Sequence, residues 1–452
     1  MLFVEDHFNP IIKFLEERRK KCDAMVCIMS ATEVSRLTFM GRLDMSKPTS
    51  GALGFLKRLK GSKENKASKG GESQMRLLRR LPKILRYLPG TAQDLRMYFL
   101  TLQYWLAGSE ENIVGLVSNL VSKYSSGFNQ KCKSKIIVKD PVEYPGIGVY
   151  HPRMKGRISE MASSIPKVVR DRDYKGTVGV IVLRSYLLSG NSGHYDGVIA
   201  ALEAQGLRVI PVFAMGLDSR PAIRNFFIKN NKVLVDAVVS LTGFSLVGGP
   251  AYNDAKAAEE ILAELDVPYL AAHPVEFQTI ADWNSSDRGL LPVENTIMVA
   301  IPELDGAISP MIFGGRPGKD LKINSEVGKI TDASLDDNPT EKDMVVCSER
   351  AAMLAERVKN LVALREKEVS QKKVAFVIFN YPPNAGNVGT AAHLGVFESL
   401  FHTLNSLKDT GYTVELPKDA NELRKKLLEG NASLYSTDAN VAEKIPVDKY
   451  VV

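Results

Sequence analysis

Residues 179–220 read GVIVLRSYLLSGNSGHYDGVIAALEAQGLRVIPVFAMGLDSR, and this stretch decides the fold. An apolar run at 178–183 is followed by a loop of Ser, Gly and Asn at 189–193. A helical pattern then runs to Gly206, and a second apolar run follows at 209–213. This order predicts a strand, a loop, a helix and a parallel strand, which together form a β-α-β unit. Ligands of such units bind at the loop that leaves the carboxyl end of the first strand. The side chains offered by that loop are Asn191, Ser192, His194, Tyr195 and Asp196.

The composition is that of a globular protein with no transmembrane segment. The chain has 452 residues, of which 44% are hydrophobic and 25% charged, and this length favours about two to four domains. No apolar run approaches the roughly 18 residues needed to cross a bilayer. The first residues, MLFVEDHFNP, lack the basic and apolar regions of a signal peptide. The four cysteines match no zinc or redox spacing, which favours a reducing, cytoplasmic setting.

The net charge of +7 comes from one segment of the chain. Between Lys57 and Arg86 there are 11 Lys or Arg residues and two acidic residues, Glu64 and Glu72. No aromatic side chain interleaves with these bases before Tyr87, although a surface that stacks nucleobases would require one. We therefore expect no nucleic-acid partner.

Residues 75–122 are expected to be helical, after a linker rich in Lys, Gly and Ser at 44–74. The apolar residues of the first helix share one face and the basic residues lie off it. Two interpretations are open: a basic surface helix packed on a core, or a docking face for an acidic partner. The apolar residues are Leu77, Leu78, Leu81, Ile84, Leu85 and Leu88, and the basic ones are Arg76, Arg79, Arg80, Lys83 and Arg86.

The order of strand, loop and helix recurs along the chain. It predicts the α/β class, with several doubly wound parallel-sheet units of the Rossmann or flavodoxin type and an inserted helical segment. The expected N-terminal elements are a helix at 9–21, a strand at 24–29 and a helix at 30–36. After residue 220 we expect a strand at 233–241, the loop TGFSLVGGP at 242–250, a helix at 254–265 and a strand at 268–272. The last unit comprises a strand at 374–379, a loop at 380–389, a helix at 390–408 and a strand at 412–416.

Changes in composition suggest the domain boundaries. The Pro- and Gly-rich connector DPVEYPGIGVYHPR, residues 140–153, ends the first domain, and a charged, weakly patterned segment follows residue 315. The expected domains are an N-terminal α/β unit with the basic linker and helical segment (1–140), an α/β domain with two β-α-β units (141–315), a linker or hairpin excursion (316–343) and the start of a further, truncated α/β domain (344–452).

Two loops, SGNSG at 189–193 and NAGNVG at 384–389, place Gly and Asn before a helix. The backbone N–H groups at such a helix N-terminus favour a phosphate or a carboxylate. An ordinary tight turn with an N-cap is the equally open alternative. The sequence contains no Walker motif and no G-x-G-x-x-G after a strand, so we do not expect this chain to hold its own ATP or NAD.

Histidine is the residue type that could move a proton or bind a metal near neutral pH. His194 follows the first Gly/Asn loop, and either function or a role as a capped loop histidine is open for it. His151 and His273 stand next to prolines at the ends of expected elements, whereas core packing is expected for His393. No paired-histidine motif supports a zinc site, and no G-x-S-x-G motif supports a serine hydrolase.

Four stretches, GVYHPRM, residues 183–220, LTGFSLVGGPA and NYPPNAGNVGTAAHLGVF, resemble the large (H) subunit of magnesium chelatase. The cobalt chelatase large subunit is a relative of that family. The sequence of these stretches is more similar to the bacteriochlorophyll-making bacterial branch than to the plant one. The resemblance implies insertion of Mg²⁺ into protoporphyrin IX, the first committed step toward chlorophyll and bacteriochlorophyll. The family's large subunits are more than twice this length, so we expect an amino-terminal portion that is inactive alone.

The resemblance also implies partners. Family large subunits bind the porphyrin, and two smaller subunits, an AAA+ ATPase and an integrin-like subunit, supply ATP hydrolysis. Mg²⁺ is then a substrate, ATP is bound by the partners, and no resident metal is expected. The compartment would be the bacterial cytoplasm, or the chloroplast stroma for a plant or algal chain. The alternatives are a non-catalytic scaffold that docks the ATPase subunits, and a cobalt chelatase subunit acting on a corrin ring.

The porphyrin carries two propionates, which suit Gly-rich helix N-termini or an arginine. We therefore expect the SGNSG, GGP and NAGNVG loops to line one cleft. The catalytic base is unknown, with His194 as the candidate. The expected substrate-binding residues are Arg184, Asn191, Gly193, His194, Tyr195, Gly248, Gly249, His273, Asn384, Gly386, Asn387 and Gly389.

Overall fold

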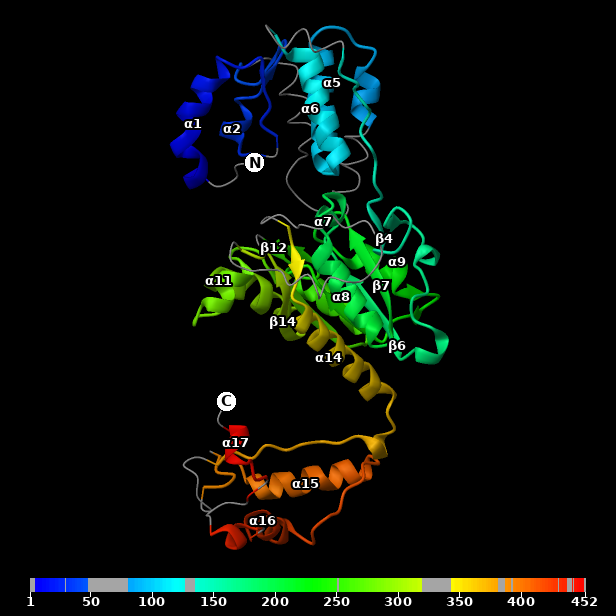
Figure 1. Cartoon of the computed structure of the whole chain (residues 1–452), viewed down its shortest axis with the longest axis vertical. Coiled ribbons are helices and arrows are strands. Elements are labelled where there is room, and N and C mark those ends of the chain that lie inside the picture. The colour runs from blue at the N-terminus through cyan, green and yellow to red at the C-terminus, as the bar shows by residue number, and fades with distance from the viewer. Residues whose placement is uncertain are drawn as a thin grey trace. The chain divides into compact units, whose positions relative to one another are not determined.

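The computed structural model describes residues 5–28, 30–47, 80–126, 135–249, 252–318, 343–380, 387–391, 393–429, 431–436, 441 and 443–450. The chain divides into two compact units, Met1–Lys359 and Asn360–Val452 (Figure 1). The domain boundaries expected near residues 140, 315 and 343 stay predictions. Most of the expected linker at 44–74 and of the segment at 316–343 lies outside the described residues.

An eight-stranded mixed sheet is the centre of the first unit, which confirms the α/β class. Its five middle strands are parallel and run in the chain order 2-1-3-4-5, the flavodoxin-like arrangement. Short antiparallel strands cover both edges. Across the sheet the strands are β15 (Val345–Val346), β14 (Ile308–Gly315), β13 (Tyr269–Val275), β10 (Ala237–Ser240), β6 (Gly176–Ile181), β7 (Leu207–Ala214), β4 (Ile147–Tyr150) and β5 (Ile158–Ser159).

The β-α-β unit expected from residues 179–220 is confirmed. β6 pairs with β7 in parallel, from Gly176 opposite Leu207 to Ile181 opposite Val212, and α8 (Gly193–Ala204) connects them. A short helix that the sequence pattern did not predict, α7 (Arg184–Leu188), occupies part of the connecting loop. The second expected unit is also present, as β10, α10 (Ala255–Leu265) and β13.

Helices cover both faces of the sheet, as a buried parallel sheet requires (Figure 1). α8 packs on β7, β14 and β15, and α9 (Arg220–Phe226) packs on β7 and β4. One core cluster joins β-strand residues such as Val238 to Ile223 of α9 and Ile261 of α10. The long α14 (Ser348–Glu366) adds a row of buried apolar side chains that includes Leu354 and Val358.

Shorter elements complete the first unit around this sheet. Two hairpins and several single-turn helices connect the main strands and helices. These elements are η2 (Ala162–Ser164), η3 (Asp171–Asp173), β8 (Ile228–Lys229), β9 (Lys232–Val233), β11 (Gly248–Gly249), β12 (Tyr252–Asn253), α11 (Ile280–Ser285), α12 (Pro292–Glu294), the π-helix η4 (Asn295–Ala300) and α13 (Ile301–Leu304).

The N-terminal strands pair differently from the expectation. The strand predicted at 24–29 is only β1 (Ala24–Met25), and it joins β2 (Phe39–Met40) and β3 (Leu43–Asp44) in an antiparallel sheet. The prediction of a parallel α/β arrangement here was wrong, because β2 runs antiparallel to both β1 and β3, and a tight turn with Gly41 at φ 58° joins β2 to β3. The helices of this part are α1 (Glu5–Arg19) and α2 (Thr32–Ser35).

The expected helical segment is present as residues 80–85, α5 (Thr91–Ala107) and α6 (Glu110–Tyr124). Ser109 caps α6 by accepting a hydrogen bond from the Asn112 backbone N–H. Of the expected apolar face, Leu81 and Leu85 are buried in a cluster with Leu95 and Phe99, but Ile84 and Leu88 are exposed. Leu77 and Leu78 lie outside the described residues.

In the second unit the two predicted strands, 374–379 and 412–416, are wrong. The backbone there forms no strand, and the Val377 side chain is 97% exposed. A strand needs a neighbour to satisfy its backbone N–H and C=O groups, and the described part of this unit contains no strand. The helix predicted from residue 390 begins at 396. The elements of this unit are η5 (Val369–Gln371), α15 (Val396–Asp409), α16 (Ala420–Glu429), η6 (Ala432–Tyr435) and α17 (Val447–Tyr450).

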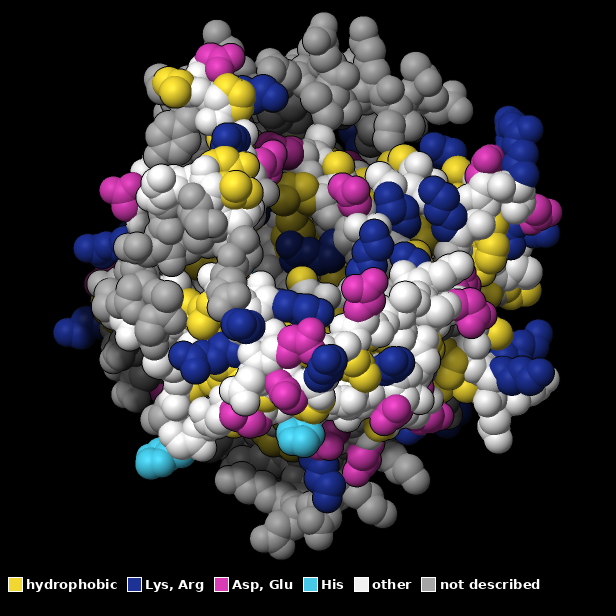
Figure 2. Space-filling view, turned by 90° about the horizontal axis from the view of Figure 1, so that it is seen from below, with side chains coloured by type: hydrophobic (Ala, Val, Ile, Leu, Met, Phe, Trp, Pro, Cys, Tyr) yellow, Lys and Arg dark blue, Asp and Glu magenta, His cyan; other side chains and the backbone are white. Residues whose placement is uncertain are grey.

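Basic and acidic side chains are interspersed on the face of the molecule seen in Figure 2. The described bases are therefore not gathered into one patch on that face. The most basic stretch of the sequence, residues 57–79, lies outside the described residues, so the expected absence of a nucleic-acid partner stays a prediction.

A substitution at Gly179 in β6 can test how closely the sheet packs against Phe227. A Cβ at this position would lie 2.5 Å from the Phe227 ring, which is fully buried. We expect Gly179→Ala to lower the free energy of unfolding by about 1–3 kcal/mol, as measured by urea denaturation.

Phe227→Leu removes the part of the ring that an alanine Cβ would meet. The double variant is therefore expected to be more stable than the sum of the two single changes. Strict additivity of the two losses would contradict the contact.

Candidate functional site

The order of the parallel strands reverses at β6, because β7 lies on one side of it and β10, the next strand of this sheet along the chain, on the other. In doubly wound sheets a ligand binds in the crevice at the carboxyl ends of the strands where the order reverses. Here the loops at 182–192 and 241–247 leave those two ends. We call this place the switch-point edge.

Arg184 is the first residue of α7 and follows β6 directly. Its guanidinium donates hydrogen bonds to the backbone carbonyls of Pro145, at 2.9 Å, and Tyr144, at 3.2 Å. The arginine therefore ties the Pro- and Gly-rich connector to the carboxyl end of β6.

The SGNSG loop is held by a segment far along the chain. The Asn191 side-chain oxygen accepts a 2.7 Å hydrogen bond from the Met344 backbone N–H. Gly193 begins α8, and a Cβ there would lie 3.2 Å from the Met344 carbonyl oxygen. The glycine lets this backbone approach closely, and the asparagine fixes it. Whether the loop also binds a carboxylate stays a prediction.

A polar network that the sequence patterns did not reveal lies beside this loop. The Tyr150 hydroxyl at the end of β4 donates a hydrogen bond to the Asp196 carboxylate and lies 3.1 Å from the Ser192 hydroxyl. Arg157 pairs with the Asp196 carboxylate at 2.5 Å and also reaches Ser192 at 3.1 Å. Burial raises the pKa of Asp196, and the Arg157 charge offsets part of that effect. Asp196 lies in the first turn of α8, where a carboxylate is favoured.

His194 is fully buried among aromatic rings. Its ring lies 3.8 Å from the Tyr195 ring, 5.0 Å from Tyr186 and 5.8 Å from Phe313, centre to centre. Neither ring nitrogen has a hydrogen-bond partner among the described residues. Burial lowers the pKa of His194 to about 3, so the ring is neutral at pH 7. Tyr195 is equally buried, and its hydroxyl accepts a 3.4 Å hydrogen bond from the Leu183 backbone N–H.

His273 lies on β13 and has different neighbours from His194. A Cβ at Gly243 would lie 3.6 Å from the His273 Cβ and 3.7 Å from the Met298 side chain. Burial lowers the pKa of His273 to about 4. His151, in the connector at 140–153, is buried too, with Nε2 2.9 Å from the Glu203 carboxylate.

Tyr186 connects α7 with the end of β13. Its hydroxyl donates a 2.8 Å hydrogen bond to the Glu276 carboxylate. Burial raises the pKa of both groups, and the Arg316 charge offsets part of the rise at Glu276. A carboxyl group of raised pKa beside a phenol can hold a proton at this edge of the sheet. Neither residue was among the candidates that the sequence suggested.

The two glycines of the GGP loop have a packing role in the structure. Gly248 adopts φ 127°, and a Cβ there would lie 2.3 Å from the Tyr252 carbonyl oxygen. A Cβ at Gly249 would lie 2.3 Å from Leu217 Cδ1. The Gly248 N–H donates a hydrogen bond to the Leu217 carbonyl at 2.8 Å. The loop thus depends on glycine because its backbone is crowded.

The NAGNVG loop belongs to the second unit, and its residues Asn384 and Gly386 lie outside the described part of the chain. Gly389 adopts φ 70°, and its N–H donates to the Phe379 carbonyl at 2.8 Å. The Thr390 hydroxyl donates to the Asn387 carbonyl at 2.9 Å. That this loop lines one cleft together with the SGNSG and GGP loops stays a prediction.

A search of the described residues finds no cluster of three or more His, Cys, Asp or Glu side chains that could hold a metal ion. The helices within the same ranges include none that is both long and apolar enough to span a membrane.

A flavodoxin-like sheet whose switch-point edge carries polar loops defines an α/β protein with a ligand edge of the doubly wound type. Residues 102–452 match the family model described as CobN/Magnesium Chelatase, and the chain belongs to that family. Residues 1–99 match a second model, described as a domain of unknown function (DUF3479).

Similar proteins agree with this assignment. The chain is 45% identical, over its full length, to the H subunit of the magnesium chelatase of Cereibacter sphaeroides, and it spans 37% of that protein. It is 35% identical over its full length to the chloroplastic magnesium-chelatase ChlH subunit of Oryza sativa, and spans 32% of it. The catalytic subunit of cobaltochelatase from Mycobacterium tuberculosis shares the fold, with a TM-score of 0.50 and 22% identity over 75% of this chain and 25% of that one.

The burial of His194 predicts a pH-dependent stability. Its folded pKa of about 3 lies below the ordinary value of 6.5, so the unfolded chain takes up the proton first. Stability is therefore highest above pH 6.5 and falls as the pH drops toward 3. His194 accounts for about 2 kcal/mol of the loss between pH 7.5 and pH 5.

His194→Phe keeps an aromatic ring and removes the titration. We expect this variant to lose less stability than the parent chain between the same two pH values, measured by denaturant unfolding. The exposed His402, changed to Phe, serves as the control and leaves the pH dependence unchanged. If the His194→Phe variant lost as much stability between the two pH values as the parent chain, a neutral, buried His194 ring would be contradicted.

Proposed function

We propose that this chain is part of the large subunit of a magnesium chelatase and contributes to holding protoporphyrin IX while Mg²⁺ is inserted. The observation that carries the proposal is the 45% identity to a magnesium-chelatase H subunit over the full chain. Because the chain spans 37% of that relative, the complete reaction is proposed for the whole large subunit and not for these residues alone.

The switch-point edge is the proposed contact with the porphyrin in the first unit. Its loops border the place where doubly wound sheets bind ligands, and Arg184 carries a charge that suits a propionate. Asn191, Gly193, Gly248 and Gly249 shape those loops. The proposed contribution of the second unit is the loop that contains Asn387 and Gly389.

Insertion requires that Mg²⁺ lose its water shell and that two pyrrole protons leave the ring. Mg²⁺ sheds water reluctantly and prefers oxygen ligands, and a site that excludes water with a base nearby would assist both steps. We propose His194 as the candidate base, a role that requires its buried, neutral ring first to become accessible. ATP hydrolysis is assigned to an AAA+ ATPase and an integrin-like partner subunit, since this sequence has no Walker motif.

The identity to magnesium-chelatase subunits favours magnesium over cobalt and a corrin ring. A scaffold that docks the ATPase subunits is the second candidate function. A specific observation favours it, since Ile84, Tyr87 and Leu88 are exposed next to Arg80, Lys83 and Arg86. A surface that is both apolar and basic fits an acidic partner.

Titration of protoporphyrin IX into the 452-residue chain, followed by fluorescence quenching, tests porphyrin binding. We expect saturable binding in the parent chain. Arg184→Gln and Asn387→Ala are each expected to weaken it about threefold to tenfold, because each removes a hydrogen-bonding group from a proposed contact.

Arg224→Gln is the matched control for the arginine. Arg224 is 60% exposed in its side chain and lies on α9 in a surface ion pair with Glu264, so its removal should leave porphyrin affinity unchanged. A chain that folds but does not quench with porphyrin would support the scaffold function. Equal affinity in Arg184→Gln, Asn387→Ala and the control would remove these loops from the porphyrin contact.

A further inference from the structure

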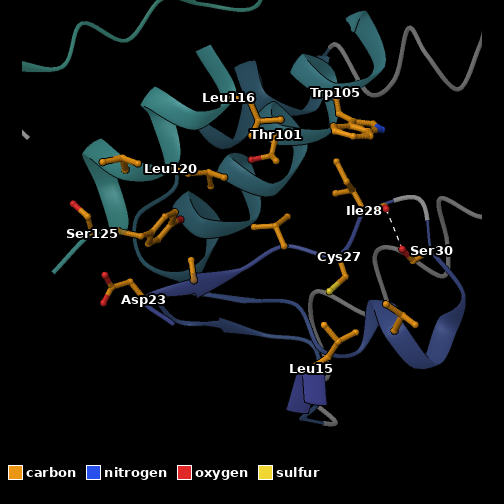
Figure 3. Close-up of a pocket in the computed structure, with 15 residues that line it drawn as sticks. Leu15, Asp23, Cys27, Ile28, Ser30, Thr101, Trp105, Leu116, Leu120 and Ser125 are labelled. Atoms are coloured by element: carbon orange, nitrogen blue, oxygen red, sulfur yellow. Dashed lines mark hydrogen bonds between the residues drawn. The ribbon is translucent and has the colours of Figure 1, made fainter. Parts of the chain in front are cut away.

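A pocket of about 610 Å³ lies in the N-terminal part of the chain (Figure 3), and its lining includes no residue of the switch-point loops. One wall is the start of the small antiparallel sheet and the residues that follow it, including Val26 and Ile28. The other wall is the hairpin of α5 and α6, which contributes Trp105, Leu116 and Leu120. Its volume falls in the range of small-molecule sites, which are mostly apolar with a few polar groups.

The pocket is elongated. Leu116 and Ser125 both line it and are nine positions apart along α6 and its C-cap, which corresponds to about 14 Å at 1.5 Å per residue. Trp105, near the C-terminus of α5, lies at one end, and Asp23 and Ser125 lie together at the other (Figure 3). The backbone N–H of Ser126 donates a 2.9 Å hydrogen bond to Asp23, which fixes that end.

Ser125 is the polar group that the pocket leaves unsatisfied. The residue is 8% exposed, and its hydroxyl has no hydrogen-bond partner among the described residues. Two other lining hydroxyls are satisfied, since Thr101 donates to the Met97 carbonyl and Tyr124 to Asp94, both at 2.8 Å. A buried hydroxyl without a partner is unfavourable, and a ligand with one polar end would satisfy it.

The charges of the lining disfavour an anionic ligand. Among the described residues that line the pocket, none is Lys, Arg or His, and Asp23 is the one acidic residue. An anion would therefore be desolvated without a cation in the lining, and the nearby Arg19 guanidinium is already paired with Asp44. The Cys27 thiol adds no charge, because burial raises its pKa above the usual value.

We propose that this pocket binds an uncharged, elongated lipid-like alcohol. Its apolar chain lies between the small sheet and the α5–α6 hairpin, and its terminal hydroxyl exchanges a hydrogen bond with Ser125. The site is separate from the proposed porphyrin contact, so failure of either proposal leaves the other standing.

Tryptophan fluorescence can report binding at this site. The chain has two tryptophans, Trp105 and Trp283, so Trp283→Phe leaves the pocket residue as the single reporter. In that background, dodecan-1-ol is expected to change the Trp105 emission saturably. Dodecanoate, which has the same chain length and a negative charge, is expected to bind at least tenfold more weakly.

Three variants locate the site. Ser125→Ala is expected to weaken dodecan-1-ol binding about fivefold, the loss of one hydrogen bond. Leu120→Phe adds a ring inside the pocket and is expected to abolish binding. Val117→Phe places the same ring on α6 at a position that is 52% exposed and does not line the pocket, so it should bind like the parent.

Thiol protection gives a second readout that does not require a filled pocket. In a chain with Cys22, Cys132 and Cys347 changed to Ser, dodecan-1-ol should slow the reaction of Cys27 with a maleimide. An unchanged rate, or no saturable change in Trp105 emission, would overturn the proposal. So would equal affinity for dodecanoate, or displacement of dodecan-1-ol by protoporphyrin IX at stoichiometric concentration.

Discussion

β6 is hydrogen-bonded along both of its edges, to β7 on one side and to β10 on the other. Parallel strands need helical crossovers, and these place every loop that follows a strand at one edge of the sheet. The SGNSG loop, Arg184 and the loop after β10 therefore lie at the same edge although more than 50 positions separate Arg184 from Ser240 in the chain. Without Gly179, the close packing of β6 under Phe227 would not be available.

Local sequence patterns predicted the fold correctly where an element is stabilised by its own periodicity or by pairing with the next strand of the same sheet. The β-α-β unit of residues 179–220 and the unit that follows it are of this kind. The patterns failed where pairing decides the outcome. Residues 374–379 are apolar enough for a strand but have no strand beside them among the described residues, and residues 24–25 pair antiparallel with residues 39–40, a partner that no local pattern at 24–29 specifies.

In the candidate site, too, local patterns predicted some features and missed those that depend on distant parts of the chain. The sequence indicated which edge of the sheet carries the polar residues, but not what each residue contacts. Asn191 bonds to Met344, 153 positions away, and no local pattern contains that information. The sequence placed His194 after a loop of small residues, and the structure surrounds its ring with rings from α7, α8 and β14. The Tyr150–Arg157–Asp196 network was likewise hidden, because it joins the β4–β5 hairpin to α8.

The central claim is that the switch-point edge of the first unit contacts the porphyrin. Hydrogen–deuterium exchange of the chain with and without protoporphyrin IX tests it most directly. The account predicts slower exchange of the backbone amides in residues 182–192 and 241–249 when porphyrin is bound. Unchanged exchange in both loops, with protection confined to other segments such as α5 and α6, would contradict it.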